Sequence, residues 1–436
     1  MLRIAEEIVH IMHNDYAGCL DKKGWDSSDA FLEKVQQGNN LSSKEFLALV
    51  DDYLLDFKDQ HLYMVADGKS VERPRTRGFS VRRYEDRLYI TKVDSDNRLV
   101  PGMHFISVGG FSIRELREKH HRLLSENHPE RENWSPILFQ YEEGVVIDSK
   151  GNQQQITFRL FDKTPYVPEY SIRRLDEGPL LLTFTDFMNP DAIANLIEKH
   201  KDLLDTVDQW IIDVRVNNGG SDASYFPLIP YLMTEEGVEL QNLDETMLFN
   251  CTEASSDRAV EVLKKDLEAV EDGHFRDVLR IFEREWTRHR GEGFVEFDFG
   301  DVVENTFVKG YRSPSQIIVL SDKMCGSAGD SFVEHVKKSS KVTVIGRATM
   351  GLNDYANLVP QSWDGYTLMY PTSRLSRIDK GEGMTGVGIT PHVHISWTPD
   401  HSTCDPDLER ALDILGRRAG GQDRNRESRC EVSELL

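Results

Sequence analysis

The stretch Met324-Cys325-Gly326-Ser327-Ala328-Gly329-Asp330 joins two segments of different period. The segment before it, 316–320, is apolar and β-rich, and the segment after it, 332–338, has helical spacing. Ser327 is therefore predicted at a glycine-flanked junction between a buried strand and a helix. The unpaired N–H groups of a helix start can receive an oxyanion there while a serine hydroxyl attacks a carbonyl. The alternative is that Ser327 only caps the helix, which is an ordinary role for serine.

The composition excludes several classes of partner. The chain has 436 residues, 39% of them apolar, which is enough for two or three domains with a hydrophobic core. Its formal net charge of -22 argues against nucleic acid and against anionic membrane surfaces, because both bind basic faces. We interpret the charge as a source of solubility, and we expect neither partner. A homo-oligomer is compatible with the sequence.

The compartment is predicted from the N-terminus and the cysteines. Residues 1–10 are amphipathic and acidic, without the apolar core and cleavage site of a signal peptide. No window reaches the apolar length of a membrane span. The sequence therefore predicts a reduced, cytoplasmic protein without disulfides or structural zinc. Its five cysteines are widely spread, with no C-x-x-C pair: Cys19, Cys251, Cys325, Cys404 and Cys430.

Residues 1–72 are predicted to form a helical N-terminal region. Apolar residues such as Ile4, Ile8 and Ile11 follow helical spacing, and the last helix ends before the segment Asp56-Phe-Lys-Asp-Gln-His61. His61 is thus expected where the chain leaves the helix. An isolated histidine carries little specificity, so the alternative is a surface or half-buried residue.

Residues 73–165 change to a strand pattern. Within them the segment 99–113 contains a turn, a short strand, a Gly-Gly turn and a helix start, and it resembles a PDZ module. Arg75 and Arg77 precede Gly78 and Phe79, where a carboxylate-binding loop would lie. The first interpretation is that these residues capture the C-terminal carboxylate of a peptide that pairs with a sheet edge. The alternative is a solvated basic face. The arginine cluster consists of Arg73, Arg75, Arg77, Arg82, Arg83 and Arg87.

Residues 166–418 alternate between strand and helix patterns, which predicts an α/β core. Asn217-Asn-Gly-Gly220 follows the second buried strand, and its glycines would let backbone N–H groups approach a ligand, unless they only make a tight turn. The charged, mostly helical segment 235–312 interrupts the core and is interpreted as an insertion that could cover the site. Residues 419–436 are predicted to be a disordered tail.

Four segments, in this order, resemble the tail-specific (C-terminal processing) serine protease family. They are Asp56-x-x-Asp-x-His61, Asp213-Val-Arg-Val-Asn-Asn-Gly-Gly220, Cys325-Gly-Ser-Ala-Gly-Asp330, and Gly346-x-x-Thr-x-Gly351 followed by Gly388-Ile-Thr-Pro391. The branch that looks most similar is the group of tricorn-core and retinoid-binding-protein-like members. The resemblance implies an α/β fold with a β/α core of the ClpP/crotonase-like type, a helical N-terminal part and a PDZ-like module.

The resemblance also implies roles for single residues. Ser327 matches the nucleophile, and His61 matches the histidine base of the tricorn-like branch. The backbone N–H groups of Ala328 and of Gly219 or Gly220 would form the oxyanion hole. A base within reach of the serine hydroxyl is chemically required, and imidazole titrates near neutral pH.

The sequence departs from the family pattern at two places. Leu352 stands where the lysine-using branch has its lysine, so a Ser–Lys dyad is not expected. The tricorn-like branch orients its histidine through a serine and a late glutamate, but here Gln60 precedes His61 and Thr385 aligns near the glutamate. Asp59 and Glu382 are the candidate orienting residues, and the sequence leaves the choice between them open.

The predicted function is hydrolysis of peptides or unfolded proteins near their C-termini, with Ser327 as nucleophile and His61 as general base. No metal or organic cofactor is expected, because the sequence has no H-E-x-x-H, phosphate-loop or dinucleotide motif. The alternative is a catalytically inactive peptidase fold that binds a peptide or a small apolar ligand.

Overall fold

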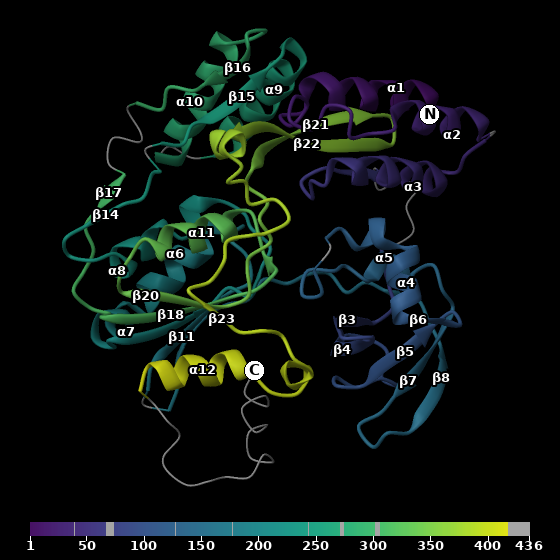
Figure 1. The fold of residues 1–436 in the computed structure, drawn as a ribbon. Coiled ribbons are helices and arrows are strands. Elements are labelled where there is room, and N and C mark those ends of the chain that lie inside the picture. The colour runs from purple at the N-terminus through teal and green to yellow at the C-terminus, as the bar shows by residue number, and fades with distance from the viewer. Residues whose placement is uncertain are drawn as a thin grey trace.

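The computed structural model describes residues 1–38, 40–66, 74–126, 128–176, 178–242, 244–270, 274–300 and 306–416. Arg73 of the arginine cluster and the tail 419–436 lie outside the described residues. In Figure 1, helices α1–α3 lie beside the β21–β22 hairpin, the α/β core has helices on both faces of its sheet, and strands β3–β8 form a separate group. The fold is mixed α/β, as the sequence predicts.

The N-terminal helices pack on a five-stranded sheet built from distant parts of the chain. Helix α3 begins with a capping box in which Ser42 and Glu45 satisfy each other's backbone N–H groups. Buried faces of these helices share one core with the hairpin, including Phe46, Val50 and Tyr370. Strand β1 pairs with β22, so the chain passes from the helices through His61 directly into the sheet. The elements are α1 Leu2–His10, the π-helix η1 Ile11–Asp15, α2 Ser28–Gln37, α3 Ser43–Leu54, the short helix η2 Leu55–Phe57, β1 Tyr63–Ala66, β21 Tyr355–Trp363 and β22 Tyr366–Leu375.

The segment predicted as an insertion contributes to the same sheet. Strand β15 pairs with β22, and β16 pairs with β15. The rings of Phe249 and Phe297 stack with centroids 3.9 Å apart, and Trp286 packs edge-on against both. This segment therefore extends the sheet that carries His61. Its elements are β14 Val238–Glu239, β15 Met247–Cys251, α9 Glu253–Ala269, α10 His274–Arg288, β16 Gly293–Glu296 and β17 Phe307–Val308.

Strands β3–β8 form a small antiparallel sheet with its own core. The strand order is β3-β4-β5-β7-β8, with β6 paired to β5, so β3 and β8 are the edges. Phe105, Val108 and Trp134 are central to the core. The elements are β2 Arg75–Thr76, β3 Phe79–Tyr84, β4 Arg87–Val93, β5 His104–Val108, β6 Phe111–Ser112, α4 Ile113–Lys119, η3 His121–Leu124, α5 Ser135–Leu138, β7 Glu143–Ile147, β8 Gln153–Thr157 and β9 Phe161–Asp162.

A six-stranded sheet, ordered β10-β11-β12-β18-β20-β23, forms the centre of the α/β core. All neighbouring strands are parallel except β10 and β11. Alternate residues face opposite layers: Trp210 and Ile212 pack under helices such as α11, whereas Ile211 faces α12. The elements are β10 Tyr170–Arg174, β11 Leu180–Phe184, α6 Pro190–Lys199, α7 Lys201–Thr206, β12 Gln209–Asp213, β13 Val216–Asn217, α8 Ile229–Leu232, β18 Gln316–Ser321, β19 Met324–Cys325, α11 Ala328–Lys337, β20 Val342–Gly346, β23 Val393–His394 and α12 Pro406–Ile414.

The parallel strands bring the predicted site segments together. The segments that follow β12, β18 and β20 leave the sheet at its carboxyl edge, where parallel α/β sheets place their sites. Short strands β13 and β19 pair beyond this edge, which joins the Asn217–Gly220 turn to the Ser327 turn. Within the described ranges, no helix is both long and apolar enough to cross a membrane.

Candidate active site

Ser327 occupies a strained turn between β19 and α11. Its φ of 57° and ψ of -119° lie in a region that residues with a side chain rarely adopt. Such strain persists only where the surroundings hold it, and it is concentrated at functional sites. The conformation differs from an ordinary helix cap, which has extended dihedral angles.

The Asp330 carboxylate holds this turn. It is fully buried and accepts hydrogen bonds from the backbone N–H groups of Ser327 (2.8 Å), Gly351 (2.8 Å) and Leu352 (2.9 Å). Burial raises the pKa of Asp330, and these N–H groups oppose the rise because they stabilise the ionised form. One side chain thus ties the serine to the loop that follows β20.

Asn353 holds the same turn from its other side. Its Nδ2 donates to the Ser327 carbonyl oxygen (2.8 Å) and to the Ser331 hydroxyl (2.9 Å). The backbone N–H of the strained residue is therefore bound at the start of its own helix, and its C=O is bound by a side chain of another segment. Leu352, in the position of the family's lysine, lies beside Gly326, where its Cδ1 would be 3.1 Å from an added Cβ.

The two glycines of the Asn217–Gly220 turn differ in what their N–H groups bind. The Gly219 N–H donates to the side-chain oxygen of Asn217 (3.0 Å), so it is already used. In the part of the chain that the structure describes, no protein acceptor is recorded for the N–H of Gly220 or of Ala328. These two groups can therefore bind an oxyanion. Gly219 instead lets its turn lie close to Ser327, because a Cβ on residue 219 would lie 2.6 Å from the Ser327 Cβ.

We expect Gly219→Ala to lower kcat/KM by a factor of about 10² to 10³, which is typical for disruption of an oxyanion hole. The new methyl group would push Ser327 away, and φ at this residue is +76°. The matched control is Gly365→Ala, since Gly365 has φ +85° and open space around its Cβ position. The measurement is steady-state hydrolysis of a peptide together with a thermal melt. Equal losses in the two variants would mean that backbone strain alone, and not contact with Ser327, causes the effect.

His61 lies between η2 and β1, with 8% of its surface exposed. Its backbone N–H donates to Asp59 Oδ1 (2.9 Å), and its Nδ1 contacts the Tyr355 carbonyl oxygen (2.7 Å). Because a carbonyl oxygen can only accept, Nδ1 carries the hydrogen. The neutral ring then has its free lone pair on Nε2, which is the form that a general base needs.

One short segment connects His61 to Ser327. Asn353 contacts the Ser327 carbonyl, and Tyr355, two residues later, contacts the His61 ring. Consecutive Cα atoms are about 3.8 Å apart, so the Cα atoms of Asn353 and Tyr355 are less than about 8 Å apart. The fold therefore joins two residues that are 266 positions apart in sequence to the same short segment.

The predicted orienting residues do not contact the Nδ1 atom, whose partner is the Tyr355 carbonyl. Asp59 binds the His61 backbone instead of its ring. Gln60 reaches Glu126 (3.5 Å), and the Thr385 hydroxyl donates to Asp354 (2.7 Å). Glu382 is exposed. The sequence predicts a carboxylate bound to the His61 ring, but the structure has a backbone carbonyl there. Every residue has a backbone carbonyl, so side-chain identity carries no signal for this contact.

The residues predicted to capture a carboxylate already have partners. Arg75 forms an ion pair with Asp162 (3.2 Å), and the buried Arg77 donates to the carbonyl oxygens of Phe139 (3.2 Å) and Tyr141 (2.8 Å). Gly78 has φ +79° and leads into edge strand β3, where Phe79 is buried. A peptide carboxylate would have to displace these partners of the two arginines, so carboxylate capture stays a prediction.

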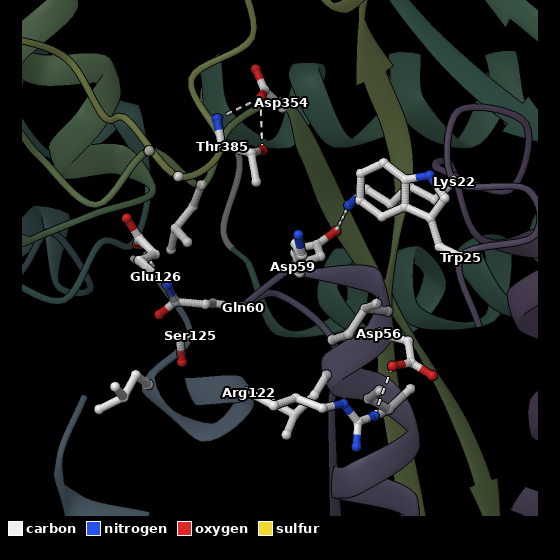
Figure 2. Close-up of a pocket in the computed structure, with 18 of the residues that line it drawn as sticks. Lys22, Trp25, Asp56, Asp59, Gln60, Arg122, Ser125, Glu126, Asp354 and Thr385 are labelled. Carbon is white, nitrogen blue, oxygen red and sulfur yellow. Dashed lines mark hydrogen bonds and ion pairs between the residues drawn. The ribbon is translucent and has the colours of Figure 1, made fainter. Parts of the chain in front are cut away.

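A cavity of about 1360 Å³ lies beside the site, between the end of α3, the α4–η3 segment and the loops around 350–355 and 383–386. Its lining includes Gln60 and Leu62, on either side of His61, and Gly351 and Leu352, next to Asn353. Figure 2 shows Gln60, Asp59 and Lys22 on one side of this cavity and Asp354 and Thr385 on another. Its position and size suit a bound peptide segment.

No group of three or more metal-ligating side chains is found within the described ranges. The residues gathered at Ser327 are instead backbone amides, an imidazole and a buried carboxylate. This set of groups is suited to nucleophilic acyl transfer.

Comparison with known proteins relates the core to one family. Residues 180–395 match the model of peptidase family S41. The match includes the Asn217–Gly220 and Ser327 turns and the loop at Leu352, whereas His61 precedes it. No curated protein sequence matches the chain.

Solved structures resemble the chain over nearly its whole length. Mature CPAF complexed with lactacystin superposes with a TM-score of 0.64 at 14% identity, covering 95% of this chain and 96% of the other. Mature CPAF gives 0.62 at 15% identity with the same coverage. The photosystem II D1 C-terminal processing protease gives 0.46 at 10% identity, covering 95% and 97%. At such identities the similarity to CPAF shows a shared fold, including the N-terminal part and the β3–β8 sheet.

Proposed function

Residues 180–395 belong to peptidase family S41, and on this premise we propose that the protein is a serine peptidase with Ser327 as nucleophile and His61 as general base. The observation that carries the assignment is the strained Ser327 turn, clamped by Asp330 and Asn353 beside two available N–H groups. Ser327 and Asp330 also form a capping box at the start of α11, but capping alone requires neither the positive φ of Ser327 nor the hydrogen bond from Asn353.

The proposed reaction has two stages. Ser327 Oγ attacks the peptide carbonyl carbon while its proton moves to His61 Nε2, and the N–H groups of Gly220 and Ala328 bind the oxyanion. When the C–N bond breaks, the proton passes from His61 to the leaving amine. Water then attacks the acyl-enzyme with His61 again as base, which releases the carboxylic acid and restores Ser327. The Tyr355 carbonyl keeps the Nδ1 hydrogen in place and stabilises the imidazolium that forms.

A fluorophosphonate probe tests this function, because it reacts only with an activated serine. We expect covalent labelling at Ser327 in the intact protein, located by peptide mapping, and no labelling after denaturation. Labelling should be lost in Asp330→Asn if the carboxylate holds the turn. A folded protein that resists the probe would contradict the peptidase assignment and would favour the inactive binding protein.

We further propose that the β3–β8 sheet is a PDZ-like module, that substrates are cut near their C-termini, and that the protein is cytoplasmic. The open edge of β3 after Gly78 supports peptide pairing, and an extended chain added there would direct its terminus toward Arg75. The free thiols of Cys19, Cys251 and Cys325 support a reducing compartment.

Peptides with a free C-terminus should bind better than their amidated forms, and the preference should shrink as salt increases. The reason is that an exposed guanidinium such as Arg75 attracts a carboxylate and is screened by salt. Matched acid and amide peptides would be compared by KM at low and high ionic strength. Equal KM values at low salt would exclude carboxylate capture and would leave the roles of Ser327 and His61 untouched.

A further inference from the structure

Lys22 is a buried lysine close to the supports of His61. Its side chain is 4% exposed, and its Nζ donates to the Tyr16 hydroxyl (2.7 Å). The same Nζ lies 3.9 Å from Asp59 Oδ2 and 4.1 Å from the centre of the Tyr355 ring. Figure 2 shows Lys22 directed at Asp59 at the side of the cavity. Burying a lysine is costly unless it is paired, so this arrangement calls for an explanation.

The partners of Lys22 are the groups that hold His61. Asp59 uses Oδ1 to accept the His61 backbone N–H and Oδ2 to accept the Tyr16 hydroxyl (2.7 Å). Tyr355 provides the carbonyl that binds His61 Nδ1. The rings of Tyr16 and Tyr355 are 5.5 Å apart, which closes the cluster. Lys22 thus lies beside the two residues that bind His61, Asp59 at its backbone N–H and Tyr355 at its ring, although no contact between Lys22 and the ring itself is recorded.

We propose that Lys22 and Asp59 form a charge-balanced positioning pair that orients His61 and sets the pH range in which it acts as a base. This inference rests on the proposed function, because it assumes that His61 accepts the Ser327 proton. Neither residue touches the substrate in this role. The ring itself is held by the Tyr355 carbonyl, and Lys22 acts on His61 only through Asp59 and Tyr355.

The other acidic groups around Lys22 and Asp59 have partners of their own, so this pair should have the largest electrostatic effect on His61. Asp21 is bound to Arg374 through both its oxygens (2.9 and 3.0 Å), and Asp354 is held by the N–H groups of Met384 and Thr385. Beyond Gln60, Glu126 is paired with Arg131. Burial lowers the pKa of Lys22, and Asp59, Asp354 and Asp21 oppose this because each favours the ammonium form.

Removing either member of the pair should therefore shift the acid limb of the pH–rate profile, in opposite directions. Lys22→Met leaves the Asp59 charge unbalanced near His61, which favours imidazolium, so the half-maximal pH of kcat/KM should rise by about 0.5 to 1 unit. Asp59→Asn keeps an acceptor for the His61 N–H but leaves the Lys22 charge, so the half-maximal pH should fall by a similar amount. The double variant should return toward the value of the unmodified protein.

The measurement is kcat/KM for one peptide between pH 5 and 9, repeated with the rate of fluorophosphonate labelling of Ser327. Lys34→Met is the matched control, because Lys34 pairs with Asp52 on the surface of the same helical part (3.2 Å), and it should shift nothing. Lys22→Arg, which keeps the charge, should retain the original half-maximal pH.

The outcomes separate this inference from the proposed function. If Ser327 is labelled but both variants keep the original half-maximal pH and only lose rate or stability, the pair is merely structural and the inference is wrong. If Lys22→Met does not fold, Asp59→Asn alone decides, because a rise or no change in its half-maximal pH contradicts the proposal. A protein in which Ser327 is never labelled contradicts the proposed function instead.

Discussion

Replacement of Ser327 by alanine should reduce peptide turnover by a factor on the order of 10⁶, as is typical when a serine peptidase loses its nucleophile. The fold should persist, because Asp330 and Asn353 bind the backbone of residue 327, and these contacts do not need the hydroxyl. Alanine also has the same Cβ as serine, so the positive φ costs the same in both. Turnover and thermal melting of the purified variant would be compared with those of the unmodified protein.

The control for this variant is Ser362→Ala, at an exposed position of β21, which should retain full turnover. An inactive Ser327→Ala protein with an unchanged melting temperature would support a chemical role. Turnover close to that of the unmodified protein would remove Ser327 from the mechanism.

His61→Ala should be almost as damaging, with a loss of about 10⁴-fold or more, because Ser327 then has no base to receive its proton. In the unmodified protein, kcat/KM should decline toward acidic pH. The sign follows from the mechanism, because the base must be neutral to accept the Ser327 proton. A pH profile from 5 to 9 and the activity of the variant are the measurements.

His13→Ala provides the control, since His13 lies in the same helical part but pairs with Asp26 near the surface. Its pH profile should match that of the unmodified protein. A profile that stays flat down to pH 5 would count against a histidine base and would turn attention to Lys22, the buried lysine at the cavity wall.

The structure shows what Leu352 does at the position where one branch of the family has a lysine. The Leu352 side chain lies beside Gly326, and its backbone N–H helps to hold Asp330, so the loop keeps its supporting role without the charge. In the proposed mechanism the base comes instead from the N-terminal part, where His61 directly precedes strand β1 and β1 pairs with β22. The expected Ser–His chemistry therefore depends on packing between segments far apart in the chain.

Local sequence determined the main elements of this protein. The apolar run 316–320 followed by Gly326-Ser327-Ala328 predicts a strand, a turn and a helix, and the structure has β18, the Ser327 turn and α11 there. Such predictions succeed because side-chain period and glycine placement act over a few residues. The oxyanion donors, by contrast, were predicted from the family resemblance as Ala328 and either Gly219 or Gly220, with the choice between the two glycines left open.

Only the tertiary structure decided how the catalytic base is held. A backbone carbonyl at Tyr355 and a carboxylate at Asp59 bind His61, and the buried ammonium of Lys22 lies beside both residues, yet the Tyr355 carbonyl has no side-chain signature, and the sequence does not mark Lys22 as buried. Likewise, nothing in the sequence shows that Asn217 uses up the Gly219 N–H group. These contacts join residues that are neighbours only after folding, because burial and hydrogen-bond geometry are properties of the packed chain and not of the local pattern.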